Sequence, residues 1–202
     1  MFFNRGMILS VTWLNLILMF FLLLYTQQNK NGPFYFFLII CIITGIAVEI
    51  IGTKTGWLFG EYKYGDVLGP EIQNVPLIIG INWFIVMFCC GITIHTILSK
   101  LLNKLSEQTG NERTKLKAFS IINDGATLAV FFDWIMEPVA MKLGYWNWEN
   151  SEIPLYNYLC WFLVSSALLA IFHFCKFNKQ NKFAVNLLLI QMMFFLLLRT
   201  FL

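Results

Sequence analysis

The chain has 202 residues, of which 58% are hydrophobic, 17% aromatic and 12% charged, and its net charge is +3. Soluble domains carry roughly 25% charged residues because their surfaces must be wetted. A mean hydropathy of +0.69 leaves too little polar material to cover a globule. A soluble enzyme, a nucleic-acid-binding protein and a disordered segment are therefore excluded, and an integral membrane protein is predicted.

Six apolar stretches are long enough to cross about 30 Å of hydrocarbon as helices, since about 20 residues are needed. They are residues 7–26, 34–52, 76–98, 116–136, 156–175 and 183–202. We expect an all-α integral membrane protein with about six transmembrane helices. No Pro-rich or Ser-rich linker divides the chain, so residues 1–202 are predicted to form a single transmembrane domain.

An even number of spans places both termini on one side, together with the long loops after the second and fourth spans. That side carries five Lys and Arg residues, and the opposite side carries nine. Basic residues accumulate on the cytoplasmic side of membrane proteins. We therefore expect a multi-pass protein of a bacterial or archaeal cytoplasmic membrane with both termini outside.

Matching spacings relate the second and third spans to the fourth and fifth. Glu49 and Asp133 each lie eleven residues before a glycine, and Pro76 and Pro154 are each followed by Trp after seven residues and by His after nineteen. Such self-similarity indicates a parallel internal repeat. The predicted repeat units are about residues 34–98 and 116–175.

Carboxylates inside the spans are the first candidates for chemistry, because ionisable side chains cost about 2.5–3.5 kcal/mol to insert at a helix centre. Glu49 and Asp133 lie near the outer ends of their spans and are expected to converge beneath the long loops. Burial and a like-charged neighbour keep a carboxyl group protonated, as a general acid requires. The alternative is that both side chains bind loop backbone or loop Lys.

Two further carboxylates lie on the same span as Asp133. Glu137 follows it at i+4 and shares its helix face if the helix extends that far. Asp124 lies about 13 Å deeper by helix geometry, where it either belongs to a deep polar site or holds helices together. The predicted catalytic residues are Asp133, Glu49, Glu137 and Asp124.

Aromatic residues gather near these carboxylates at the outer ends of the spans. They form either an interfacial belt or a cage around a carbocation, in which each face contributes up to about 2 kcal/mol when desolvated. The predicted substrate-binding residues are Trp57, Tyr62, Tyr64, Trp83, Trp134, Trp146, Trp148 and Trp161. No metal site is expected, because the five cysteines lie inside apolar runs and form no CxxC pair.

Two segments resemble the signatures of the bacterial and archaeal carotenoid biosynthesis membrane proteins. The first is GWLFGEYKY at 56–64, followed by NVP at 74–76 and by Trp83. The second is DWIMEPVA at 133–140, followed by LGYWNW at 143–148 and NYLCW at 157–161. The resemblance covers about residues 44–161. Glu137 and Cys160 stand where the family pattern has Asp and Gly.

Characterised members of that family are carotenoid 1′,2′-hydratases acting on γ-carotene-type or bisanhydrobacterioruberin-type substrates. The resemblance implies that a carboxylic acid protonates the terminal double bond of an acyclic end group and that water captures the tertiary carbocation. This chemistry needs no cofactor, and none is expected. Asp133 and Glu49 are the predicted acid/base pair, and which of the two donates the proton is left open. The expected partners are a lipophilic carotenoid substrate, membrane lipid and other carotenoid-pathway enzymes, and no nucleic acid.

Three alternatives remain open at this point. A membrane lycopene cyclase protonates a similar alkene but lets an internal double bond capture the cation. A small proton-coupled transporter also uses parallel repeats and intramembrane carboxylates. A non-catalytic subunit would hold other pathway enzymes together.

Overall fold

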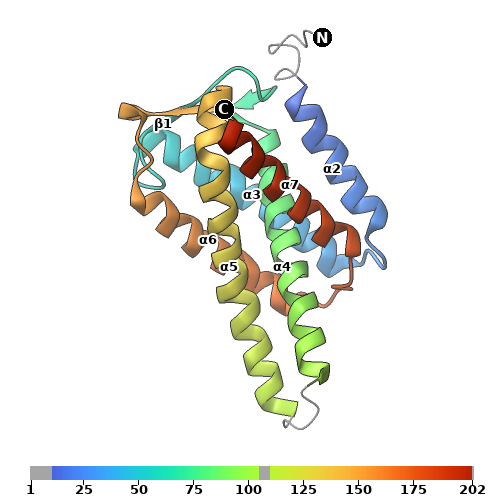
Figure 1. The fold of residues 1–202 in the computed structure, drawn as a ribbon. Coiled ribbons are helices and arrows are strands. Elements are labelled where there is room, and N and C mark those ends of the chain that lie inside the picture. The colour runs from blue at the N-terminus through green and yellow to red at the C-terminus, as the bar shows by residue number, and fades with distance from the viewer. Residues whose placement is uncertain (1–10, 105–109, 202) are drawn as a thin grey trace.

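The computed structural model describes residues 11–104 and 110–201, which contain six α-helices, labelled from α2 onward (Figure 1). The helices are α2 (Thr12–Thr26), α3 (Gly32–Thr55), α4 (Ile78–Lys104), α5 (Gly110–Leu143), α6 (Leu155–Phe174) and α7 (Lys182–Phe201). The strands and the 3-10 helix are β1 (Tyr62–Tyr64), β2 (Glu71–Ile72), β3 (Val75–Pro76), β4 (Trp146–Trp148) and η1 (Glu149–Ser151).

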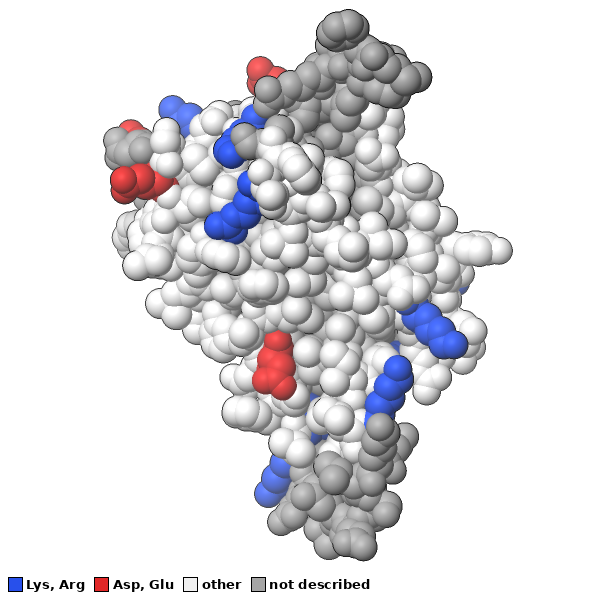
Figure 2. Space-filling model, in the orientation of Figure 1, with Lys and Arg blue, Asp and Glu red and all other residues white. Residues whose placement is uncertain are grey.

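Helices α3 to α7 are long and apolar enough to cross a membrane, which confirms the predicted all-α membrane class. Helix α2 has 15 residues, and the predicted beginning of its span at residue 7 lies outside the described residues. Large apolar side chains such as Leu18, Ile43 and Leu197 face outward, where lipid tails would cover them. On the face in Figure 2, most Lys, Arg, Asp and Glu lie toward the two ends, with a largely uncharged band between them.

Helix α5 extends further than the sequence predicts. The apolar stretch was expected to end at residue 136, but the helix continues through Pro138 to Leu143. Proline lacks the N–H that would bond to the carbonyl four residues earlier, which belongs to Trp134. Arg199 of α7 donates a hydrogen bond to that carbonyl oxygen at 3.0 Å, so the helix passes the proline without leaving the carbonyl unpaired. Asp133 and Glu137 consequently share one face of α5.

The beginning of α2, the end of α7 and all four strands lie at one end of the helices (Figure 1). Thr12 Oγ1 lies 3.1 Å from Tyr145 Oη, and the Arg199 contact with Trp134 brings the end of α7 there as well. This arrangement agrees with both ends of the described chain lying on the same side as the two long loops. The internal repeat remains a prediction.

Two strands from different loops form a small layer over this end. Strands β1 and β4 pair antiparallel, with Tyr62 opposite Trp148 and Tyr64 opposite Trp146. Successive side chains of a strand point to opposite faces, so all four of these aromatic side chains lie on one face. That face covers the ends of α3 and α5, where the predicted carboxylates lie.

Helix α4 is the most buried of the five long helices and forms the centre of the fold. Its Trp83 packs directly against the backbone of α3 at Gly45, where an added Cβ would lie 2.6 Å from Trp83 Cγ. Toward the other end of the helices, buried Phe rings fill the interior, among them the pair Phe37 and Phe172 with centroids 5.3 Å apart. The buried carboxylates of the described residues, Glu49, Asp133 and Glu137, all lie toward the end beneath the strands.

Candidate active site

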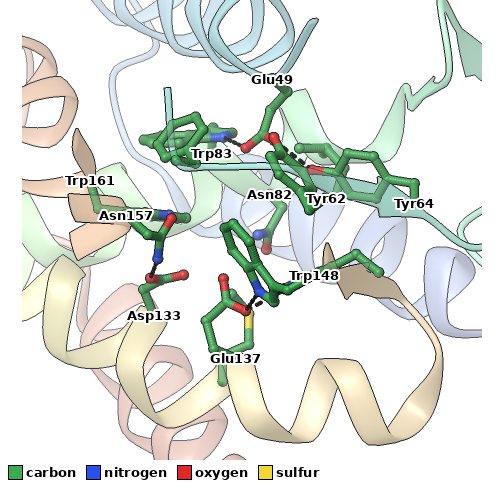
Figure 3. Close-up of a pocket in the computed structure, with 14 residues that line it drawn as sticks. Glu49, Tyr62, Tyr64, Asn82, Trp83, Asp133, Glu137, Trp148, Asn157 and Trp161 are labelled. Carbon is green, nitrogen blue, oxygen red and sulfur yellow. Dashed lines mark hydrogen bonds between the residues drawn. The ribbon is translucent and has the colours of Figure 1, made fainter. Parts of the chain in front are cut away.

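A small cavity lies beneath the β1–β4 layer, between α3, α4, α5 and α6 (Figure 3). Nine of the predicted site residues line it, namely Glu49, Asp133, Glu137, Tyr62, Tyr64, Trp83, Trp146, Trp148 and Trp161. Its free space is about 30 Å³, which exceeds the roughly 10–15 Å³ that one water molecule needs. Helices α3 and α5 therefore bring together three of the four predicted carboxylates around a space that can hold water.

Glu49 of α3 is a buried carboxylate with both oxygens occupied. Its Oε2 accepts hydrogen bonds from the hydroxyls of Tyr62 and, at 2.7 Å, of Tyr64. Its Oε1 accepts a hydrogen bond from Trp83 Nε1 at 3.0 Å. Burial, and then the charge of Glu49, raises the pKa of the Tyr62 hydroxyl and of the Tyr64 hydroxyl above the ordinary value. Both phenols therefore remain donors, and this carboxylate is stabilised as an anion.

Glu137 of α5 is held in a similar way by the opposite strand. The indole N–H groups of Trp146 and Trp148 both donate to its Oε2, each at 2.8 Å. These residues alternate along β4, so the strand supplies two donors on one face. The structure gives Oε1 of Glu137 no hydrogen-bond donor among the described residues, and this oxygen is left available to the cavity.

Asp133 differs from the two glutamates. It is fully buried, with 0% of its surface exposed, and its Oδ2 accepts one hydrogen bond from Asn157 Nδ2 at 3.0 Å. Its Oδ1 is buried and unpartnered among the described residues. A buried carboxylate with one donor is poorly stabilised as an anion. The neutral acid suits this position, because its hydroxyl can donate into the cavity.

A pair of stacked indoles forms one wall of the cavity. The rings of Trp83 and Trp161 have centroids 4.2 Å apart and planes 13° apart. Trp83 also donates to Glu49, so the position of the stack is coupled to that carboxylate. Aromatic faces with a carboxylate at their edge form a surface that can stabilise a positive charge in an otherwise dry site.

Three predicted site residues lie outside this cavity. Asp124 accepts a hydrogen bond from Ser120 one turn earlier in α5, well below the strand layer. Trp57 follows the left-handed Gly56 at the end of α3 and is 85% exposed. Trp134 points away from the cavity, stacks on Phe131 and lies under the Arg199 guanidinium at 4.1 Å.

The sequence interpretation missed two amides, Asn82 and Asn157, which line the cavity together with Phe59, Ile79 and Met136. Asn157 donates a hydrogen bond to Asp133 from its Nδ2. Both amides occur within apolar stretches, Asn82 one residue before Trp83 and Asn157 four residues before Trp161. A strongly polar side chain in a membrane span usually has a partner or a function, and this signal was available in the sequence.

No group of three or more His, Cys, Asp or Glu side chains in residues 11–104 and 110–201 is placed to hold a metal ion. The site that these residues form is a set of carboxyl groups with different hydrogen-bond donors, enclosed by aromatic rings. Such a set is suited to moving protons to and from a bound apolar molecule.

The fold and the cavity define a multi-pass membrane protein with a carboxyl-lined cavity at one end of its helices. The chain belongs to the family of carotenoid biosynthesis proteins, whose family model matches residues 6–202, as the two signature segments predicted. The bisanhydrobacterioruberin hydratase of Haloarcula japonica is 25% identical over 131 residues, or 63% of this chain and 40% of that protein. The match thus spans less than half of that relative's length. No solved structure matches the chain.

Proposed function

We propose that this chain is a carotenoid hydratase that adds water to the terminal 1′,2′ double bond of an acyclic end group. Family membership supports a carotenoid substrate, and the name of the Haloarcula relative supports hydration. The observation that carries the proposal is the fully buried Asp133, whose unpartnered oxygen borders a cavity that also holds Glu49 and Glu137.

In the first step, the carboxylic acid of Asp133 transfers its proton to the less substituted carbon of the terminal double bond. The π electrons form the new C–H bond and leave a tertiary carbocation on the carbon that carries two methyl groups. Asn157 donates to Oδ2 of Asp133, which keeps the acid oriented and stabilises the carboxylate that forms.

The carbocation is then stabilised by the walls of the cavity. The free face of the Trp83–Trp161 stack supplies cation–π attraction of up to about 2 kcal/mol when desolvated. Glu49 supplies a fixed negative charge, because its three hydrogen-bond donors hold it as an anion and make it a weak base. Its role here is electrostatic, whereas the sequence placed it with Asp133 in an acid/base pair of unassigned roles.

Glu137 is the proton acceptor in the second step. A water molecule attacks the cation through oxygen, and Oε1 of Glu137 takes one of its protons, which gives the tertiary alcohol. Asp133 and Glu137 lie one turn apart on α5, so the proton returns from Glu137 to Asp133 over a short path. The net change is the addition of one water.

The apolar body of the substrate lies outside the cavity, along the lipid-facing helices. The four-carbon 2-methylpropenyl end of the substrate is larger than the free space of the cavity, so binding requires aromatic side chains or the β1–β4 layer to move. The long polyene then extends through the ~30 Å hydrocarbon core, which matches it in length.

Expression of the chain in a bacterium that makes acyclic carotenoids tests the proposal. Chromatography with mass detection is expected to show a more polar product heavier by one water. Asp133→Asn keeps the shape of the side chain but removes the acid, and is expected to lower product at least 100-fold at equal protein level. Asp66→Asn, the same change at an exposed loop position, is the matched control and should leave product unchanged.

The alternatives give different results in the same experiment. An isomeric pigment of unchanged mass would indicate a cyclase and contradict hydration. Unchanged pigments with several acyclic substrates, despite normal protein in the membrane, would remove the enzymatic proposal and favour the transporter or the non-catalytic subunit.

We also propose that the cavity end faces the outside of a cytoplasmic membrane, as the distribution of basic residues supports. Single cysteines replacing the exposed Lys63 and Lys115, in a variant without native cysteines, would be treated with a membrane-impermeant thiol reagent on intact cells. Labelling at position 63 and protection at position 115 are expected. The reverse pattern would place the cavity in the cytoplasm.

A further inference from the structure

A carbocation in this cavity has three possible fates, and the protein must select one. Capture by water gives the alcohol. Loss of a proton regenerates the substrate or a double-bond isomer, and attack by an internal double bond followed by proton loss gives a ring of the same mass. Under the proposed function, hydration requires a water molecule held against the cation before the other two reactions occur.

Asn82 is the cavity amide whose hydrogen-bonding groups are not engaged by the protein. It lies on α4 one residue before Trp83, is half-buried and lines the cavity. The structure gives its side chain no hydrogen-bond partner among the described residues, whereas Asn157 is committed to Asp133. In Figure 3 the Asn82 amide lies in the space between Glu49 and Glu137.

A free amide in a partly buried polar space is a binding site for water. Leaving its N–H and C=O groups unpaired costs free energy that a bound water recovers. The cavity has room for water, and a buried water needs two to four polar partners. Asn82 supplies one donor or acceptor, and the unpaired Oε1 of Glu137 supplies another.

We propose that Asn82 holds the attacking water against Glu137, and that it thereby directs the carbocation to hydration instead of isomerisation. This inference rests on the proposed hydratase function. The Asn82 carbonyl accepts one O–H of the water and Glu137 accepts the other, so an oxygen lone pair remains for the cation. As the C–O bond forms, Glu137 takes its proton and Asn82 retains its hydrogen bond.

The test separates protonation of the alkene from capture by water. Membranes containing the protein are incubated with an acyclic carotenoid in D₂O. Protonation transfers deuterium to carbon, and loss of ordinary hydrogen from the cation leaves deuterium in recovered substrate or isomers. Deuterium in the unhydrated pigments therefore reports the first step, and the deuterated alcohol reports both steps.

Asn82→Val and Asn82→Thr form a matched pair, since the two side chains have similar shape and differ in one hydroxyl. Asn82→Val is expected to lower alcohol formation at least tenfold while deuterium incorporation into unhydrated pigment is retained or rises. Asn82→Thr, whose hydroxyl can bind the water, is expected to recover most of the alcohol. Asn123→Val, at a half-buried asparagine of α5 outside the cavity, should match the wild-type protein.

Different failures have different meanings. Equal loss of alcohol and of deuterium incorporation in both Asn82 variants would overturn the inference, because it would indicate a structural role. Normal hydration by Asn82→Val would also overturn it. A wild-type protein that neither hydrates nor incorporates deuterium would overturn the proposed function itself.

Discussion

The contact between Arg199 and α5 explains how a proline is tolerated between the catalytic candidates and the strand layer. Pro138 cannot bond to the carbonyl of Trp134, and the Arg199 guanidinium donates to it at 3.0 Å while lying 4.1 Å from the Trp134 ring centroid. We predict that replacing this arginine by methionine destabilises the protein mainly by leaving that carbonyl without a partner.

The size of the effect follows from the two contacts. A hydrogen bond from a charged donor contributes about 1.5–3 kcal/mol, and a cation–π contact at an exposed site adds roughly 0.5–1 kcal/mol. Arg199 is partly exposed, so the lower values apply and the sum is about 2 kcal/mol. At about 1.4 kcal/mol per factor of ten, Arg199→Met is expected to lower the folding equilibrium constant roughly 30-fold.

A double-mutant cycle isolates the carbonyl contact from the other effects of the substitution. Pro138→Ala restores a backbone N–H that bonds to the Trp134 carbonyl within the helix, and is expected to be neutral or stabilising. In that background Arg199→Met loses chiefly the ring contact, so its cost should fall to about 1 kcal/mol or less. The free energy of unfolding would be measured by denaturant titration in mixed micelles, with helix content read by circular dichroism.

The reasoning is refuted if Arg199→Met costs the same in both backgrounds, because the arginine would then act independently of the proline. Arg199→Lys provides a second check. It keeps the charge but lacks the planar guanidinium that donates and stacks together, so it should fall between wild type and Arg199→Met.

Two further predictions concern the walls of the cavity. Gly45→Ala puts a methyl group against Trp83. Because this displaces the indole from its hydrogen bond to Glu49, product formation should fall about tenfold. Gly32→Ala, with open space around it, is the control and should have no effect in the same pigment assay. Burial and the nearby carboxylate charge raise the pKa of Tyr62 and of Tyr64 above 10. The folded protein therefore keeps protons that the unfolded chain loses, so their contribution to stability is complete below pH 10 and falls as the pH rises further. Unfolding titrations between pH 9 and 11.5 should show this decline, and it should be shallower when both tyrosines are replaced by phenylalanine.

The helices were predictable because membrane insertion depends on local composition. A run of about 20 apolar residues suffices to identify a span, and α3 to α7 all overlap predicted stretches. The end of α5 was predicted wrongly because it depends on a contact with another helix, which local composition does not show. Glu137 and Pro138 are typical of a helix boundary, but the arginine that satisfies the freed carbonyl lies on another helix. A contact of this kind, between segments far apart in the chain, cannot be predicted from the local sequence pattern.

The sequence predicted which residues form the site better than it predicted the hydrogen bonds between them. Aromatic residues of two loops were expected near the carboxylates, and the structure brings them there by pairing β1 with β4, a pairing that the sequence did not predict. Proximity along the chain also suggested Trp57 and Trp134, but one follows a left-handed glycine outward and the other stacks against Arg199. Asn82 belongs to no repeated spacing, and its polarity within an apolar stretch was the sequence signal that could have identified it.

The hydrogen bonds distinguish Glu49 from Asp133, although their matching sequence spacing suggested that the two carboxylates were equivalent. Glu49 and Asp133 match in their distance to a glycine, yet Glu49 resembles Glu137 in its bonding, since each accepts two donors from one aromatic strand. Asp133 has a single amide donor and a free oxygen. Proton transfer requires groups that differ in their preference for the proton, and the difference here arises from which strand or helix reaches each carboxyl group. The paired strands therefore do more than cover the cavity, because they supply two donors each to Glu49 and Glu137 and none to Asp133, and the acid role proposed for Asp133 rests on this difference.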